Sequence, residues 1–434
     1  MSNTLRPSGC PGLLRIVQAL DGGICRIKLA GGAIRAEQAL AVANAARRHA
    51  GGVIEATNRA NLQIRGIGPE HDGLVAQLLA AGLGPTTAGG DDVRNLMLSP
   101  SAGIDRDLLF DTRPLADQIL ATLQTRSRLH QLSAKFAVQL DGAEALAMLE
   151  HHHDLWLSAY EANGETLLAF GLAGCPGRDK PVAAVTLDQG YELVVAVLEL
   201  FLDLASPEQN RMRDLLAETP VDNFIARLTL PLRPVDAYCR RDNPAALRLG
   251  TYPQRQENQL YVAALAPLGR LSSTMLEGAA QLAVDHGDGT LRFTPWQGLL
   301  LPNLTVDDAV RVTEGLARLG FLCSADQALT RMIACTGSSG CAKAHADTKA
   351  DARHLAALLQ GEGEGHDVHL SGCPRTCAAA HTAAVTLLAV SPGYYDVYFR
   401  DAAEPGFGRL HARTLSIEAV GALLRAHPRS NTDD

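Results

Sequence analysis

The sequence has little that would direct the chain to a secretory route, a membrane or a nucleic acid. Its start, MSNTLRPSGCPGLL, has no basic flank followed by an apolar run of signal-peptide length. The most apolar long stretch, residues 191–205, carries Glu192, Glu199 and Asp203, which argues against a membrane span. The net charge is −8 and no long basic run occurs. We therefore expect a cytoplasmic protein without membrane or nucleic-acid partners, in which residues 191–205 form a packed helix.

The sequence also lacks a dinucleotide-binding fingerprint. The glycine-rich stretches GGICRIKLAGG and AGCPGRDK have the wrong spacing and context for one. If NAD(P)H is the source of electrons, it would act through a separate electron-donating reductase, which becomes an expected partner. The chain has 434 residues, of which 47% are hydrophobic and 20% charged, so it can form a large core and two to four domains.

The chain repeats one plan of elements. Residues 22–84 read as strand, helix, strand and helix, and residues 258–321 follow the same order. Each copy is followed by a similar block, residues 93–142 and 329–378, with a helix expected near 114–126 and near 350–360. Residues 206–250 would connect the two halves. The pattern predicts α+β modules whose helices pack on one face of a sheet.

Nine cysteines in a cytosolic chain argue against disulfides, because that compartment is reducing and the count is odd. Cys335 and Cys341 lie six positions apart, Cys373 and Cys377 lie four apart, and a helix-sized segment separates the pairs. Four thiolates from two short loops favour an iron–sulfur cluster. Zinc and unliganded buried cysteines remain alternatives. The other five are expected to be packing residues: Cys10, Cys25, Cys175, Cys239 and Cys323.

With these cysteines after a duplicated module, the chain resembles the sulfite and nitrite reductase superfamily over nearly its whole length. The resemblance implies a duplicated α+β architecture with pseudo-twofold symmetry and a [4Fe-4S] cluster on the four cysteines, of which Cys377 would bridge to sirohaem. It divides the chain into a ferredoxin-like half-module (1–88), a tetrapyrrole-binding module (89–235), a linker with a second half-module (236–322) and a cluster module (323–434).

In that superfamily, arginines and lysines hold the anionic side chains of the macrocycle and the substrate, and Arg59, Arg94 and Lys135 stand at the matching positions. Sulfite reductases have a second lysine where this chain has Ala137. The loss disfavours sulfite reduction, because a charge-assisted contact contributes about 1.5–3 kcal/mol. Further candidates to surround a cavity between the halves, with a surface position as the alternative, are Arg65, Arg292, Arg331 and Arg375.

Segments 6–29, 53–66 and 333–344 look like those of precorrin-3B synthases of aerobic cobalamin biosynthesis. This resemblance implies an oxygen-dependent monooxygenase that hydroxylates precorrin-3A, a metal-free tetrapyrrole, at C20 and closes a γ-lactone. It also implies a non-haem iron. His345 and His381 each follow a candidate cluster cysteine by four positions and are weak candidates for iron ligands. The run of histidines at 151–153 is expected to be a solvated helix end.

Three functions therefore compete. The first is the tetrapyrrole monooxygenase, the second a sirohaem-dependent sulfite or nitrite reductase, and the third an electron-transfer protein without its own substrate. The duplicated modules argue against a simple carrier, since a carrier needs no cavity between them. Ala137 and the N-terminal segment SGCPGLLRI argue against the reductase.

Overall fold

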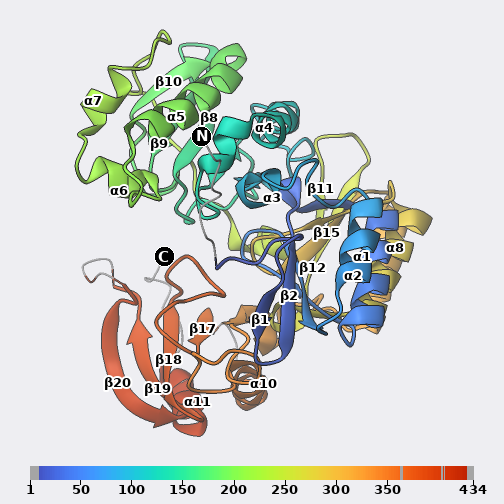
Figure 1. The fold of residues 1–434 in the computed structure, drawn as a ribbon. Helices are drawn as coiled ribbons and strands as arrows, with labels where there is room; N and C mark the ends of the chain where they lie inside the picture. Colours follow the sequence, from blue (N-terminus) through green and yellow to red (C-terminus); the bar gives the residue numbers. More distant parts are fainter. Residues whose placement is uncertain (1–8, 362–364, 402–403, 405, 428–434) are drawn as a thin grey trace.

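The computed structural model describes residues 9–361, 365–401, 404 and 406–427. Figure 1 shows three bodies: a helix-covered pair of sheets on the right, a lobe at the upper left and a lobe at the lower left. Within the described residues, no helix is both long enough and apolar enough to cross a membrane.

The right-hand body contains two five-stranded antiparallel sheets. Sheet A has the strand order β1 (Val17–Ala19), β2 (Gly22–Ile27), β5 (Leu62–Ile67), β4 (Val53–Ala56) and β13 (Arg270–Ser272). Sheet B has the strand order β11 (Gly250–Pro253), β12 (Leu260–Leu265), β15 (Gly298–Leu304), β14 (Thr290–Phe293) and β3 (Ala33–Arg35). The helices that share their core are α1 (Ala36–His49), α2 (Asp72–Ala80), α8 (Ser273–His286) and α9 (Val306–Leu319).

The two copies exchange one strand each. β13 comes from the second copy and pairs with β4 in sheet A, while β3 comes from the first copy and pairs with β14 in sheet B. One hydrophobic cluster contains buried residues from both copies. The two half-units therefore form one folded body.

Helices α1 and α8 pack together in the helix layer that covers the right-hand side of this body, with α2 next to α1 and α9 next to α8. Both bury residues, most of them alanine, at the same helical spacing, which places them on one face of each helix. These residues are Ala39, Val42, Ala43 and Ala46 in α1 and Leu276, Ala279, Ala280 and Ala283 in α8. Small side chains let the two helices approach closely. The Oγ of Ser272 accepts a hydrogen bond from the Met275 N–H (3.1 Å) and fixes the start of α8.

The two left-hand lobes have the same topology. In each sheet the first two pairings are parallel and the last two are antiparallel. The upper lobe holds sheet C: β6 (Leu96–Met97), β7 (Val138–Asp141), β8 (Leu155–Ala162), β9 (Glu165–Leu172) and β10 (Ala183–Thr186). The lower lobe holds sheet D: β16 (Met332–Ala334), β17 (Val368–Ser371), β18 (Val385–Ser391), β19 (Tyr394–Phe399) and β20 (Arg409–Ser416).

Two helices pack on each of these sheets at corresponding points of the chain. They are α4 (Arg113–Thr125) and α5 (Gly190–Leu204) in the upper lobe and α10 (Thr348–Leu358) and α11 (Ile417–Ala426) in the lower lobe. The helices expected near residues 114–126, 191–205 and 350–360 are thereby confirmed. The short helices are α3 (Gly90–Val93), α6 (Met212–Leu216) and α7 (Val221–Ile225).

Candidate functional site

The candidate cluster cysteines lie where two parallel strands of sheet D end. Cys335 follows β16 and Cys373 follows β17, while Cys341 and Cys377 lie in the turns that come next. Because β16 and β17 are parallel neighbours, their carboxyl ends present both loops on one edge of the sheet. The Gly372 N–H donates a hydrogen bond to the Cys335 Sγ at 3.2 Å and joins the two loops.

The Cys377 thiol lies within electrostatic reach of the other three candidate cysteines. Burial raises the pKa of the Cys377 thiol, and the neighbouring Cys335, Cys373 and Cys341 raise it further. Like charges disfavour a thiolate, so such a group of thiols suits a site where metal ions supply the opposite charge. The arrangement fits a [4Fe-4S] cluster, whose iron atoms each take one thiolate.

Two glycines make the loops possible. Gly337 has φ +74°, and a Cβ there would lie 2.7 Å from the Thr348 backbone nitrogen. A Cβ on Gly372 would lie 2.6 Å from the Ala344 Cβ. Larger residues would therefore separate the loop after β16 from the start of α10 and from the loop after β17. The Asp347 side chain caps α10 by accepting from the Ala350 N–H (3.2 Å).

A buried ionic network fastens the first cysteine loop to sheet A. The Glu55 carboxylate on β4 accepts from Arg270 Nη2 at 2.9 Å and lies 3.8 Å from both Arg65 Nε and Lys349 Nζ. It also accepts from the hydroxyl of Thr336, the residue after Cys335 (3.3 Å). Arg65, expected to bind substrate, donates to both Asp21 carboxylate oxygens (3.0 and 2.9 Å) and to the Gly340 carbonyl (3.3 Å). Its guanidinium is occupied by these protein contacts.

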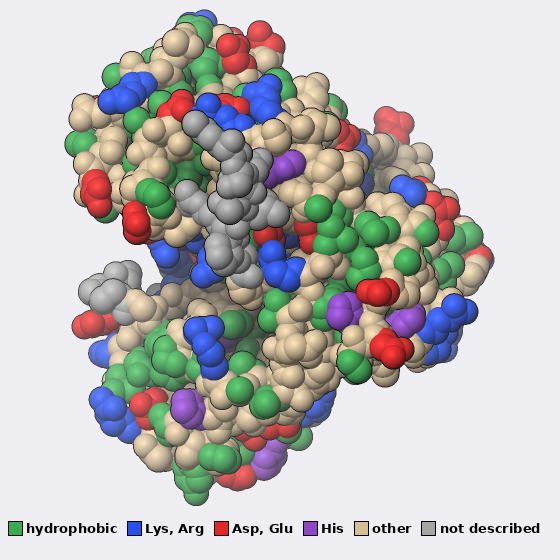
Figure 2. Space-filling model, in the orientation of Figure 1, with side chains coloured by type: hydrophobic (Ala, Val, Ile, Leu, Met, Phe, Trp, Pro, Cys, Tyr) green, Lys and Arg blue, Asp and Glu red, His purple; other side chains and the backbone are tan. Residues whose placement is uncertain are grey.

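A hollow lined by cations lies between the sheet A body and the upper lobe. It includes about 260 Å³ of empty space, some of it open to solvent. Its lining residues are Arg59, Asn61, Arg94, Asn95, Leu96, Met97, Ala137 and His153. On the face drawn in Figure 2, Lys and Arg side chains gather at the inner end of the gap between the two left-hand lobes. The Asn58 amide donates to the Cys377 carbonyl at 3.4 Å, so the Arg59 segment contacts a cysteine loop.

The two arginines of this hollow are half-buried, and their charged groups are desolvated with little compensation. Burial, then the charge of Arg211, lowers the pKa of Arg59 to about 10, while Asp154 opposes the shift. The Nε and Nη2 atoms of Arg94 are buried without a hydrogen-bond partner among the described residues, and the Asp91 carboxylate lies 3.7 Å away. Buried guanidinium groups are costly unless hydrogen-bonded. A ligand with carboxylates would satisfy them.

Sequence reasoning missed two further cations next to this site, the half-buried Arg26 and the buried Lys28. Burial lowers the pKa of Arg26, and the Cys377 thiol opposes that shift, so Arg26 lies near the cysteine loops. Burial lowers the pKa of Lys28 to about 7, and its Nζ donates to the Asp92 carbonyl at 2.8 Å. Both lie in the segment CRIKL, in which hydrophobic and cationic residues alternate. The signal that could have identified them is the presence of two cations in a strand whose other side chains belong to the core.

The expectation of a solvated helix end at residues 151–153 is wrong. The segment is not helical, and the His151 and His153 side chains are buried, while His152 is exposed. The His151 Nε2 lies 3.2 Å from the His381 Nδ1, so this pair connects the upper lobe with the lower lobe. The His153 Nδ1 donates to the His151 carbonyl at 2.8 Å, which leaves its Nε2 as a buried acceptor without a partner among the described residues.

The remaining predicted residues lie in different surroundings. Arg292 is buried, and its Nη1 donates to the carbonyls of Pro100 (3.0 Å) and Ala102 (2.8 Å). Lys135 and Arg375 are exposed, and Arg331 is half-buried. The side chain of His345 is exposed. Among the described residues, neither His345 nor His381 belongs to a set of three ligand-type side chains close enough to share one ion.

Two families of known proteins match the chain. The family "Nitrite/Sulfite reductase ferredoxin-like half domain" matches residues 17–81 and 252–319, the two copies of the right-hand body. The family "Nitrite and sulphite reductase 4Fe-4S domain" matches residues 89–233, the upper lobe. The four candidate cysteines lie outside this second match, in the lower lobe that repeats the same topology.

Individual relatives agree with these matches. Ferredoxin–nitrite reductases from Zea mays and Arabidopsis thaliana are each 29% identical over 82% of this chain, which spans 68% and 66% of their length. A precorrin-3B synthase from Sinorhizobium sp is 25% identical over 90% of this chain and 82% of its own. The solved structure of the Mycobacterium tuberculosis NirA protein superposes with a TM-score of 0.78 at 20% identity, covering 95% of this chain and 82% of that one. The chain therefore carries domains of the nitrite and sulfite reductase superfamily and has its fold, with ferredoxin-like half domains.

Proposed function

We propose that this chain is an oxygen-dependent monooxygenase of cobalamin biosynthesis, which converts precorrin-3A into precorrin-3B by hydroxylating C20 and closing a γ-lactone. The observation that carries the proposal is the pairing of Ala137 with His153 in one arginine-lined hollow. The relative named precorrin-3B synthase supports it, because its alignment covers most of both chains.

Ala137 and His153 together make the hollow a poor site for a small oxyanion. Nitrite and sulfite present only acceptor oxygens to the protein. The His153 Nε2 is itself an acceptor, since Nδ1 holds the ring hydrogen in its bond to the His151 carbonyl. Burial, with the charge of Arg59, lowers the pKa of His153 well below its ordinary value, so the ring stays neutral at pH 7. An acceptor lone pair repels an oxyanion and suits a donor, such as a pyrrole N–H of a metal-free tetrapyrrole.

The cations of the hollow suit the rest of that substrate. Arg59 and Arg94 would each bind a carboxylate of the macrocycle, with Arg26 and Lys28 adding positive charge behind them. The [4Fe-4S] cluster on Cys335, Cys341, Cys373 and Cys377 would supply electrons one at a time when bound. One oxygen atom of dioxygen forms the new C20–O bond and the other leaves as water. This consumes two electrons, supplied by a separate reductase that takes them from NAD(P)H, and two protons, supplied by solvent.

The proposal also calls for a non-haem iron, whose ligands stay unassigned. His345 and His381, the candidates from the sequence, do not form a three-ligand set, and His381 is engaged by His151.

A sirohaem-dependent nitrite or sulfite reductase is the second candidate. Several relatives are named ferredoxin–nitrite reductases and are 28–29% identical to this chain. The chain spans about two thirds of the length of the plant enzymes. Sirohaem would occupy the same cationic hollow, and its carboxylates would meet the same arginines.

Incubation with each substrate separates the two candidates. Purified protein with precorrin-3A, dioxygen and a reductant should yield a product heavier by one oxygen atom, whereas reduced protein should leave nitrite and sulfite unconsumed. Arg59→Ala should weaken precorrin-3A binding roughly 10- to 150-fold, as expected for one charge-assisted contact of about 1.5–3 kcal/mol. Arg213→Ala, on an exposed side chain, is the matched control. Nitrite consumption with unchanged precorrin-3A would replace the first candidate by the second.

A further inference from the structure

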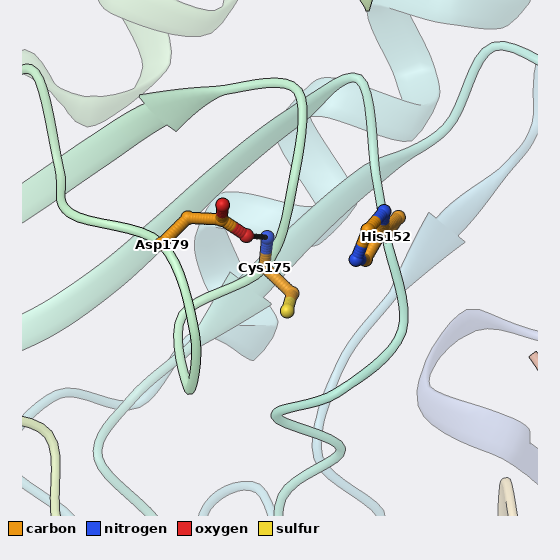
Figure 3. Close-up of side chains that lie close together, drawn as sticks. All are labelled: His152, Cys175 and Asp179. Atoms are coloured by element: carbon orange, nitrogen blue, oxygen red, sulfur yellow. Dashed lines mark hydrogen bonds between the residues drawn. The ribbon is translucent and has the colours of Figure 1, made fainter. Parts of the chain in front are cut away.

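Three side chains of different chemistry meet behind the hollow, at a place that the proposed function does not use. One donor atom each from His152, Cys175 and Asp179 lies within 4.8 Å of the other two. Figure 3 shows them on two neighbouring loops, with Asp179 on one side of Cys175 and His152 on the other. Among the described residues this is the one group of three or more ligand-type side chains that lie so close.

The loop after β9 is built to hold the carboxylate against the cysteine. The Asp179 Oδ2 accepts a hydrogen bond from the Cys175 N–H at 2.8 Å. Gly174 has φ +88°, and a Cβ at that position would lie 2.4 Å from the same carboxylate oxygen. Only glycine both adopts this backbone conformation without strain and leaves room for the carboxylate. The turn at Gly174 and Cys175 therefore holds the Asp179 carboxylate in place, although this side chain is exposed to solvent.

The sulfur itself is enclosed. The Cys175 side chain is fully buried, although Asp179 and His152 on either side are exposed. Burial and the Asp179 carboxylate raise the pKa of this thiol to about 12, so it carries a proton at neutral pH. A hydrogen bond with Asp179 contributes to that shift. A metal ion bound to both groups would displace the thiol proton, because a metal ligand has to be the thiolate.

We propose that His152, Cys175 and Asp179 bind one divalent transition-metal ion of the Zn²⁺ or Fe²⁺ class. A set of one thiolate, one imidazole and one carboxylate suits these borderline ions, whereas Mg²⁺ and Ca²⁺ take oxygen ligands. The exposure of His152 and Asp179 leaves a fourth position to water. Formation of the metal–sulfur bond releases the Cys175 proton to solvent, and no electron transfer is involved.

Such an ion would position His151 and His153, of which His153 lines the hollow, without contacting either side chain. His152 lies between His151 and His153, whose side chains are buried on the inner side of the segment. The His153 N–H donates to the Gly174 carbonyl at 2.8 Å, next to Cys175. A metal bound to His152, Cys175 and Asp179 would therefore restrain both loops. It would thereby hold in place the His153 Nε2 acceptor and the contact between His151 and His381. The proposed metal site depends only on His152, Cys175 and Asp179, and it does not depend on which substrate the hollow binds.

Cobalt(II) is a suitable probe, because cobalt bound to a thiolate gives a charge-transfer absorption band and cobalt bound to nitrogen and oxygen alone does not. Titration of the cluster-loaded protein should give this band, in the difference spectrum, with one equivalent of Co²⁺. Cys175→Ser should abolish the band. His152→Ala, a substitution on an exposed side chain that should fold normally, should raise the Kd for Co²⁺ at least tenfold. Cys239→Ser and His354→Ala replace exposed side chains elsewhere and should change neither result.

Metal analysis of the protein as purified provides a second readout that does not depend on activity. One equivalent of zinc or iron, additional to the iron of the cluster and of the proposed function, should be present and should be lost in His152→Ala. The proposal is overturned if His152→Ala binds Co²⁺ as tightly as the parent protein, if the band survives in Cys175→Ser, or if the metal content of the two proteins is equal. Failure of these tests would not contradict the proposed precorrin-3A reaction, because that reaction is assigned to the hollow and requires none of these three side chains.

Discussion

Removal of the Glu55 charge should destabilise the protein far more than removal of an exposed glutamate. Glu55 is the shared partner of Arg65, Arg270 and Lys349, with only 8% of its surface exposed. In Glu55→Gln, Arg65 keeps Asp21, but Arg270 and Lys349 lose the carboxylate that they face. Breaking a buried ion pair from one side costs about 3–5 kcal/mol. This corresponds to a roughly 150- to 5,000-fold change in the unfolding equilibrium.

The pH dependence of stability should report the same network. Burial alone would raise the pKa of Glu55, but Lys349, Arg65 and Arg270 outweigh it and hold the pKa below its ordinary value. A carboxyl group with a depressed folded-state pKa contributes stability above its unfolded pKa, about 4.3, and loses that contribution as the pH falls through the folded value. The difference in stability between the parent protein and Glu55→Gln should therefore be full at pH 7 and shrink below about pH 4.

Urea unfolding followed by circular dichroism measures this difference. Glu37→Gln is the matched control, because Glu37 also pairs with an arginine, Arg35, but the two side chains are 73% and 59% exposed. An exposed pair of this kind contributes less than about 1 kcal/mol. Equal losses of unfolding free energy in Glu55→Gln and Glu37→Gln would refute the reasoning, because burial of the network would then have no energetic consequence.

Two further substitutions test the cysteine loops and the contact between the lobes. Cys373→Ser should abolish the broad thiolate-to-iron absorption of anaerobically purified protein, whereas Cys239→Ser should retain it; retained absorption in Cys373→Ser would remove this residue from the ligand set. His381→Ala should lower the free energy of unfolding by about 1–3 kcal/mol, because it leaves the buried His151 Nε2 without its partner. In a double-mutant cycle with His151→Phe, additive losses would show that the pair does not interact.

More of the fold than of the site could be predicted from the sequence. The duplicated order of strands and helices predicted two equivalent halves, because hydrophobic periodicity is a local signal. It did not predict that β3 and β13 change places between the sheets. Each of these strands has three residues, and its partner lies more than 200 positions away. Such pairing depends on tertiary packing, including that of α1 against α8, which follow β3 and β13 in the chain. A local sequence pattern does not predict this packing.

The site was predictable where its chemistry depends on spacing and unpredictable where it depends on distant contacts. Four cysteines at short separations were visible in the sequence. The roles of His151 and His153 were not, since adjacent residues normally point to opposite sides and a histidine run reads as solvated. The contact of His151 with His381 joins residues 230 positions apart. The same holds for Arg65, whose acidic partners lie 44 and 10 positions away on other strands and loops.

The two lobes show how one topology can serve two purposes. In sheet D the ends of β16 and β17 carry Cys335 and Cys373 on glycine-containing loops. In sheet C the corresponding end of β7 carries Asp141, which is buried and paired with Arg240 through bonds of 2.7 and 2.9 Å. An ion pair within the protein thus occupies, in one lobe, the strand end that offers thiols in the other. Because thiolates hold a [4Fe-4S] cluster and no cysteine follows β6 or β7 in the described loops at this end of sheet C, the proposed cluster site is confined to the lower lobe, while the upper lobe lines the cationic hollow. The asymmetry between the lobes follows from these few residues at strand ends, since both sheets have the same strand order and pairing.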